Sequence, residues 1–196
     1  MMRKLLIITF SLCINIASVH AETDPWKESH RLEQVFQYDS AITVLKNISS
    51  DNELVNLRRG WLNYLKGSHS KSIKHYKKAI QSNSLSLDAR LGIILPLLEQ
   101  QRWREAAMHS NKVLEVAPWN YLAHVRLMQT EEALKQWEKL FKHSDAVHQR
   151  YPSDATVLVY IARASHKLGN IKQAKYFYNK VIELIPGHFE ASSYIK

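Results

Sequence analysis

The sequence predicts an all-α protein built as a stack of helical hairpins. The first observation is a repeat, because Pro118, Pro152 and Pro186 follow one another at intervals of 34 residues. A fixed period of this length is typical of helix–turn–helix solenoids. The second observation is the last full repeat, residues 155–186, in which two amphipathic stretches flank Gly169-Asn170. Glycine and proline are scarce, at five each, which agrees with helices joined by short connections.

Residues 1–21 have the layout of a secretory signal peptide. Arg3 and Lys4 precede a largely apolar stretch, and Val19-His20-Ala21 has the small-x-small pattern of a cleavage site. The alternative is an uncleaved membrane anchor, but the apolar stretch has about 15 residues, whereas a membrane-spanning helix needs about 20. We therefore expect export to the periplasm or to the outside of the cell, with a mature protein that begins at Glu22.

Charge and cysteine content narrow the possible settings. The formal net charge is +9, and removing Arg3 and Lys4 reduces it to 9 − 2 = +7. Cys13 lies in the leader, so the mature chain would contain no disulfide and no thiol. An exported helical protein without cysteine suits a bacterial periplasm. A basic protein often binds nucleic acid, but export argues against that partner.

Residues 22–196 are expected to form one domain of five hairpins closed by a short helix. The hairpins are expected at residues 24–50, 52–84, 87–118, 121–152 and 155–186, and the capping helix at residues 188–196. The first hairpin is three residues short, because Ala41 precedes its equivalent Ser72 by only 31 residues. Its second helix is expected over residues 40–48. Its polar first helix suits a terminal repeat that faces solvent.

Two of the inner hairpins contain irregular positions. Pro96 lies inside the first helix of the third hairpin, where proline costs about 3 kcal/mol in an ordinary helix, so we expect a kink or a locally opened turn. In the fourth hairpin, Leu140 takes the place of a small residue such as Ala174, and His124 and Glu131 fall on the stripe that faces the core. We therefore expect this hairpin to pack less closely.

Four large side chains occur at equivalent places, at the start of a second helix. They are Tyr38, Trp103, Trp137 and Ile171. We interpret them as residues that fill the gap between neighbouring hairpins, not as a ligand cage.

The last repeat also resembles a known family. Ala162 and Ser165 belong to an apolar stripe on its first helix, Ala174 and Tyr178 to a stripe on its second helix, and Pro186 closes the unit. Together with the period, this pattern resembles the tetratricopeptide repeat (TPR) family over about three quarters of the chain. The resemblance implies a right-handed solenoid with a concave inner wall along which partner peptides lie.

The resemblance also implies candidate binding residues, because one stripe of each first helix lines the inner wall in this family. These candidates are Trp61, Tyr64, Leu95, Leu98, Gln129, Glu132, Arg163, His166 and Lys167. The wall would run from apolar at Trp61 to cationic at Arg163, which would match a peptide with a hydrophobic end and an acidic end. Alternatively, Trp61 and Tyr64 are core residues, as most buried aromatics are, and the sequence leaves both interpretations open.

No catalytic, phosphate-binding or metal motif is found in the sequence. Nine of the ten histidines lie beyond Ala21, but they do not form helical pairs four residues apart. We therefore expect no enzyme activity, cofactor or metal. The leading hypothesis is an interaction module or scaffold that binds another cell-envelope protein or peptide. The alternative uses Lys71, Lys74 and Lys78, a basic stripe that is either a solvated face or a weak contact for anionic glycan or lipid head groups. The sequence does not indicate an oligomeric state.

Overall fold

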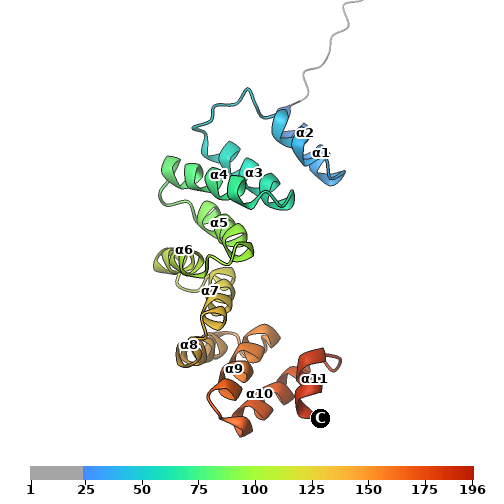
Figure 1. Ribbon diagram of the computed structural model, residues 1–196, viewed down its shortest axis with the longest axis vertical. Helices are drawn as coiled ribbons and strands as arrows, with labels where there is room; N and C mark the ends of the chain where they lie inside the picture. The colour runs from blue at the N-terminus through green and yellow to red at the C-terminus, as the bar shows by residue number, and fades with distance from the viewer. Residues whose placement is uncertain (1–23) are drawn as a thin grey trace, which may run out of the picture.

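The computed structural model describes residues 24–196, so the expected signal peptide and the expected start at Glu22 lie outside the described residues. Within the described residues all regular structure is α-helical, in eleven helices that follow one another as hairpins along the long axis (Figure 1). The helices are α1 (Pro25–Gln34), α2 (Tyr38–Thr43), α3 (Glu53–Leu65), α4 (His69–Ser82), α5 (Leu87–Glu99), α6 (Trp103–Val116), α7 (Tyr121–Ala133), α8 (Trp137–Arg150), α9 (Ala155–Lys167), α10 (Ile171–Leu184) and α11 (Phe189–Ile195).

The first helix of each long hairpin starts at a capping residue that recurs with the repeat period. The side chains of Asn52, Ser86, Asn120 and Asp154 each accept a bond from the backbone N–H three residues on, at 2.9–3.2 Å. Such a cap satisfies an otherwise unpaired N–H and contributes about 1 kcal/mol. His188, a further 34 residues on, caps α11 through Nδ1. The capping helix therefore begins in the same register as the first helices of the repeats.

One residue in a left-handed conformation ends the first helix of every hairpin. Positive φ angles occur at Phe36, Gly67, Gln101, Lys135 and Gly169, which are equivalent positions. Glycine adopts this conformation without strain, whereas a residue with a side chain loses roughly 1–2 kcal/mol. The turn geometry is therefore common to all five hairpins, although only two of them use glycine there.

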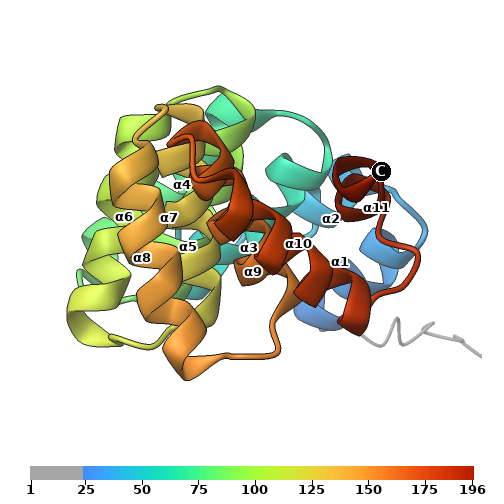
Figure 2. The ribbon, with the colours of Figure 1, turned by 90° about the horizontal axis from the view of Figure 1, so that it is seen from below.

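Contacts between successive hairpins show which side of the stack is concave. Helix α3 touches α5, α5 touches α7, and α7 touches α9, while no comparable contact joins the second helices of neighbouring hairpins within residues 24–196. The first helices therefore lie closer together and form the inner wall. Figure 2 agrees, with α6 and α8 on the outside and α5 and α7 further in.

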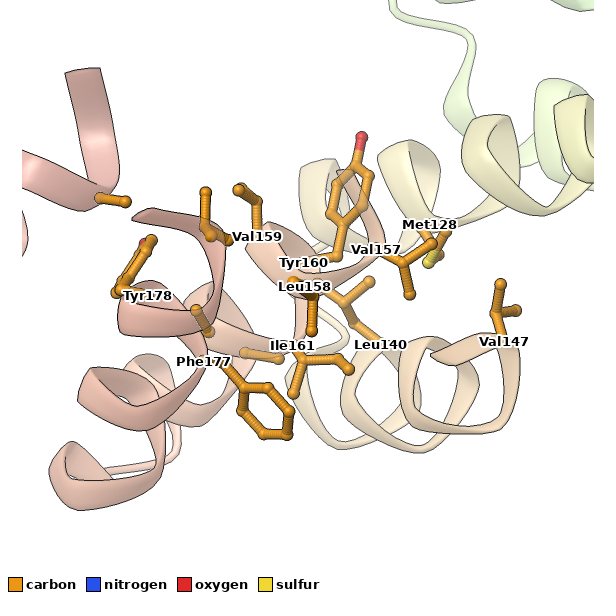
Figure 3. Packing of buried hydrophobic residues seen from close by; sticks show 14 residues of the cluster. Met128, Leu140, Val147, Val157, Leu158, Val159, Tyr160, Ile161, Phe177 and Tyr178 are labelled. Carbon is orange, nitrogen blue, oxygen red and sulfur yellow. The ribbon is translucent and has the colours of Figure 1, made fainter. Parts of the chain in front are cut away.

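The largest core cluster joins the fourth and fifth hairpins. Figure 3 shows Leu140 of α8, Ile161 of α9 and Phe177 of α10 meeting in this cluster. Ala162 and Ala174 are fully buried and let α9 and α10 approach closely, as their positions in the repeat predict. The hairpin that matches the family pattern best is therefore also the most continuously packed.

The fourth hairpin departs from this packing as expected. Met128 and Leu140, both fully buried, occupy the positions that Ala162 and Ala174 occupy in the fifth hairpin. Two large side chains thus replace two small ones between the helices, and α7 and α8 pack on each other less extensively than the helices of the other long hairpins. Polar residues take up part of the interface, because His124 and Glu131 are 8% and 1% exposed.

Two local expectations need correction. The second helix of the first hairpin ends at Thr43, not at Ile48. Three β-branched residues, Ile42 to Val44, restrict the side-chain rotamers there, and the backbone continues in tighter turns, with Leu45 N bonded to Ile42 O at 3.2 Å. Helix α5 runs continuously through Pro96, whose ring nitrogen has no hydrogen to donate to the carbonyl of Gly92.

The residues expected to fill gaps between hairpins differ from one another. Tyr38, Trp103 and Trp137 are half-buried, and each packs against one of the three core clusters. Ile171 is 44% exposed, because only the short α11 follows its hairpin. The gap-filling interpretation therefore holds for the three aromatic residues.

Candidate functional site

An open cavity of about 430 Å³ lies at the N-terminal end of the inner wall. Its lining residues come from α1, α3, α4 and α5. They are Trp26, Leu54, Leu57, Arg58, Trp61, Tyr76 and Asp88. The volume falls within the range of pockets that hold small ligands or single side chains, roughly 300–1,000 Å³. Leu54 is 61% exposed at this opening, so the cavity presents apolar surface to solvent.

Polar contacts from α1 hold Trp61 in place. The indole Nε1 donates to Glu33 Oε1 at 2.7 Å, while the buried Arg58 pairs with the other oxygen of Glu33 and donates to Ser29 Oγ at 3.0 Å. Burial alone would raise the pKa of Glu33, but the bonds from Trp61 and Arg58 outweigh it and lower the pKa. Trp61 is half-buried, with its polar edge tied to α1, and it lines the cavity.

Tyr76 lies between two glycines on the inner side of the stack. A Cβ atom added to Gly92 would lie 2.3 Å from Tyr76 Cε1, and one added to Gly60 would lie 3.0 Å from the same ring. The side chain is 3% exposed, and this burial raises the pKa of Tyr76. The glycines of α3 and α5 therefore create the slot that places an aromatic ring against the cavity.

Arg126 of α7 provides a positive charge on the same wall. Its Nη1 donates to Leu91 O of α5 at 2.6 Å, and no carboxylate of the described residues pairs with it. Burial lowers the pKa of Arg126, while the nearby hydroxyl groups of Tyr64 and Tyr76 act in the opposite direction. A half-buried guanidinium without a counter-ion has lost hydration that a bound anion would replace.

Several sequence-predicted residues lie on the inner wall, and one does not. Tyr64 and Leu95 are half-buried, and Gln129 is exposed. The ring of Tyr64 stacks at a tilt on Trp61, with centroids 5.7 Å apart. Leu98 is only 8% exposed and belongs to the core cluster of α4, α5 and α6. The expectation that it lines the groove is wrong, because its position on α5 turns it toward the interior.

The expected cationic end of the wall is already neutralised. Arg163 donates from Nε and Nη2 to the two carboxylate oxygens of Glu190, at 2.8 and 2.5 Å. Its Nη1 lies 3.1 Å from Glu132 Oε2. The bond to Glu190 is the largest factor that raises the pKa of Arg163. Two carboxylates, one of them from α11, thus occupy the place that the sequence assigned to an acidic ligand.

The other two residues of that cluster also have partners within the chain. His166 Nδ1 lies 2.8 Å from the hydroxyl oxygen of Tyr194 in α11. The ammonium group of Lys167 lies 5.8 Å from the centre of the Trp137 ring, a cation–π distance. Both residues are exposed, but neither forms an unoccupied cationic site with Arg163.

Sequence reasoning missed two residues of this wall, Trp26 and Arg126. Trp26 lies in a first helix that reads as a polar cap, and its contact with the cavity follows only from the packing of α1 on α3. Arg126 directly follows Val125, which is on the inner stripe, so a wider stripe would have included it. It is the only basic residue in α7 outside the histidine class, which was a usable signal.

The remaining candidate surfaces and centres are quickly described. Lys71 and Lys74 are exposed and Lys78 partly so, and none of the three pairs with a carboxylate of the described residues. Residues 24–196 contain no group of three or more histidine, cysteine or acidic side chains placed to hold a metal ion. None of the helices described is both long and apolar enough to cross a membrane.

Comparison with known proteins agrees with this geometry. Residues 155–188 match the tetratricopeptide repeat family. The fold is similar to that of YrrB, described as a TPR protein with an unusual peptide-binding site, at a TM-score of 0.74 and 14% identity over 86% of this chain and 89% of that one. It is also similar to MamA from Desulfovibrio magneticus RS-1, residues 41 to the end, at a TM-score of 0.76 and 16% identity over 84% and 95% of the two chains. MamA AMB-1 gives a TM-score of 0.73 and 17% identity over 84% and 99%.

No curated protein sequence matches the chain. The hairpin stack with an inner wall of first helices defines a superhelical helix–turn–helix repeat protein. The matched repeat and the similar structures make the class specific, and the chain is a tetratricopeptide-repeat protein.

Proposed function

We propose that the protein is a non-enzymatic interaction module or scaffold of the bacterial cell envelope, which holds a peptide segment of another envelope protein on its inner wall. The observation that carries this proposal is the apolar cavity beside Trp61, on the same wall as the unpaired Arg126. The TPR fold supports a protein partner, and YrrB is described as having a peptide-binding site. The signal-like residues 1–21 support the envelope setting.

The chemistry of the wall favours one kind of segment. An apolar side chain would fill the cavity next to Trp26, Leu57 and Trp61. A carboxylate further along the segment would bind Arg126, since a charge-assisted bond to a half-buried guanidinium is among the stronger polar contacts. Asp88 at the cavity disfavours an anion at that end. The segment would therefore lie with its apolar residue at α3 and its acidic group at α7.

Affinity measurements with matched variants test this proposal. A partner captured from the native envelope fraction would be measured against the wild type, Trp61→Ala and Arg126→Gln, with Arg104→Gln on the outer helix α6 as the control. Truncating an aromatic or arginine anchor costs about 2 kcal/mol or more, so we expect each inner-wall variant to bind roughly 30-fold more weakly. Arg126→Gln should also reduce the dependence of binding on salt.

Folding and export need separate checks. Circular dichroism and thermal melts show whether Trp61→Ala disturbs the core. If both inner-wall variants fold and bind at full strength, the inner-wall site is wrong. The intact mass of the native protein tests export, because we expect it to begin at Glu22, and a mass that includes Met1 would contradict the envelope setting.

The second candidate function uses the outer face of α4. This helix contains Lys71, Lys74 and Lys78 and no acidic residue, so an anionic glycan or lipid head group would meet an unbalanced positive surface. Sedimentation with vesicles that contain anionic lipid, compared for the wild type and the triple Lys→Gln variant, tests this role. Binding that disappears with the triple variant, and that falls steeply with salt, would favour it over the inner wall.

A further inference from the structure

The α7–α8 hairpin contains a continuous chain of hydrogen bonds between its two helices. Pro118 O lies 2.9 Å from His124 Nε2, His124 Nδ1 lies 2.9 Å from His143 Nε2, and His143 Nδ1 lies 2.8 Å from Glu131 Oε2. The side chains of His143 and Glu131 are 14% and 2% exposed. This polar chain occupies the interface that Met128 and Leu140 hold apart.

The two ends of the chain fix where the protons are. A carbonyl oxygen only accepts, so His124 Nε2 must carry a hydrogen to bond Pro118 O. An ionised carboxylate also only accepts, so His143 Nδ1 must carry a hydrogen to bond Glu131. The third bond needs one hydrogen between His124 Nδ1 and His143 Nε2. Three bonds therefore require three hydrogens, one more than two neutral imidazoles supply.

The surroundings decide which ring holds the additional proton. His143 faces the Glu131 carboxylate directly, and Lys139 Nζ lies 3.4 Å from the second oxygen of Glu131, which favours its ionised form. Burial lowers the pKa of His124, with the charge of His143 acting in the same direction and the Pro118 bond and Glu131 opposing it. His143 is therefore an imidazolium and His124 a neutral imidazole.

We propose that this chain is a one-proton joint: it holds α7 and α8 together while His143 alone is charged, and it releases them when His124 is protonated as well. With both rings charged, His124 Nδ1–H and His143 Nε2–H would point at each other across the 2.9 Å contact. The central hydrogen bond is then lost, and two like charges remain in a buried interface. Acidification therefore opens this hairpin before its neighbours.

Other charged groups around the joint are few. Lys139 approaches from α8, and on α7 the carboxylate of Glu132 is engaged by Arg163 of α9. The Trp119 ring lies 5.8 Å from the ring of His124. Within the described residues, no titratable side chain of α5 or α6 is within hydrogen-bond or ion-pair distance of the three residues of the joint. The proton balance of the joint is thus set by its own members and Lys139.

The neighbouring hairpin provides a control without this chemistry. Leu158, Ser165 and Phe177 occupy the positions of His124, Glu131 and His143 one repeat later, and these three residues are all buried. The triple variant His124→Leu/Glu131→Ser/His143→Phe therefore replaces the joint with side chains that the same fold already accommodates. Because α7 also carries Arg126, opening the joint would displace part of the inner wall. This last consequence rests on the proposed function, whereas the proton joint does not.

Two measurements on the full chain test the joint. Long-range proton–nitrogen NMR spectra, recorded from about pH 8 to about pH 4, should show His143 charged and His124 neutral with its proton on Nε2 near neutral pH. Hydrogen exchange should show α7 and α8 amides losing protection as His124 becomes charged, at least about tenfold more than α9 and α10 amides. In the triple variant this selective loss should be absent.

Several outcomes would overturn the joint. A neutral His143 at neutral pH contradicts the proton count. Glu131→Gln removes the ionised acceptor and should leave His143 neutral at the same pH; a charged His143 in this variant contradicts the assigned ion pair. If α7 and α8 keep their protection when both imidazoles are charged, or lose it equally in the triple variant, the joint does not control the hairpin. None of these readouts depends on a binding partner.

Discussion

Adding one methyl group at Gly92 should disrupt the contact between the second and third hairpins. The new Cβ would lie 2.3 Å from Cε1, 2.5 Å from Cζ and 2.9 Å from the hydroxyl oxygen of Tyr76. Atoms in contact need about 3.5–4.0 Å, so the ring must move. It has little room, since the ring already lies about as close to Gly60 as a Cβ atom there would permit. We expect Gly92→Ala to cost roughly 1–3 kcal/mol through overpacking.

The size of the effect is partly masked by helix propensity. Alanine is about 1 kcal/mol better than glycine inside a helix, so the measured destabilisation should be about 1–2 kcal/mol. The companion variant Tyr76→Leu removes the ring. In that background Gly92→Ala should become neutral or stabilising, by up to about 1 kcal/mol.

Urea unfolding of the four proteins in this double-mutant cycle is the assay. A coupling free energy near zero, with Gly92→Ala stabilising the wild type, would refute the packing argument. It would mean that the close approach of Tyr76 to α5 has no energetic consequence. A coupling of about 1–3 kcal/mol would confirm that the slot for Tyr76 requires glycine.

Two further predictions concern a turn and a buried histidine. Gly169 has φ of +82° with nothing near its Cβ position, and Gly187 is equally open at an ordinary φ; we expect Gly169→Ala to lower stability by about 1 kcal/mol while Gly187→Ala is neutral or slightly stabilising, as thermal melts would show, and equal effects would refute the conformational argument. Burial, followed by the charges of Arg90 and Lys77, lowers the pKa of His109 to about 4 in the folded state, so the unfolded chain binds more protons between about pH 6.5 and pH 4 and stability falls over that range; after allowance for solvent screening we expect His109→Gln to remove roughly 1–2 kcal/mol of this acid sensitivity, and unchanged pH dependence of urea unfolding would contradict it.

The binding wall shows where prediction from sequence stops. Stripe positions such as Trp61 and Gln129 follow from helical periodicity, because side chains three or four residues apart share a face. The state of Arg163 does not follow from periodicity, since its partners Glu132 and Glu190 lie 31 and 58 − 31 = 27 residues away along the chain. A charge found by pattern is available to a ligand only if no distant carboxylate reaches it first.

The sequence by itself determined the hairpin register of this protein. Capping residues, left-handed turn positions and small residues between helices all recur at the same interval, and each acts through local backbone geometry or through contacts within one hairpin. These interactions span few residues, so a linear pattern contains them. The early end of α2 at Thr43 escaped because three adjacent β-branched residues altered the local winding without changing the apolar pattern.

Only the tertiary structure decided which polar groups are paired. Packing of α1 on α3 ties Trp61 to Glu33, packing of α11 on α9 neutralises Arg163, and Arg126 is left without a carboxylate. Each of these outcomes depends on side chains brought together from different hairpins. The physical reason is that the free energy of a charged group depends on its neighbours in space and on its burial, and neither is encoded in the spacing of residues along the chain.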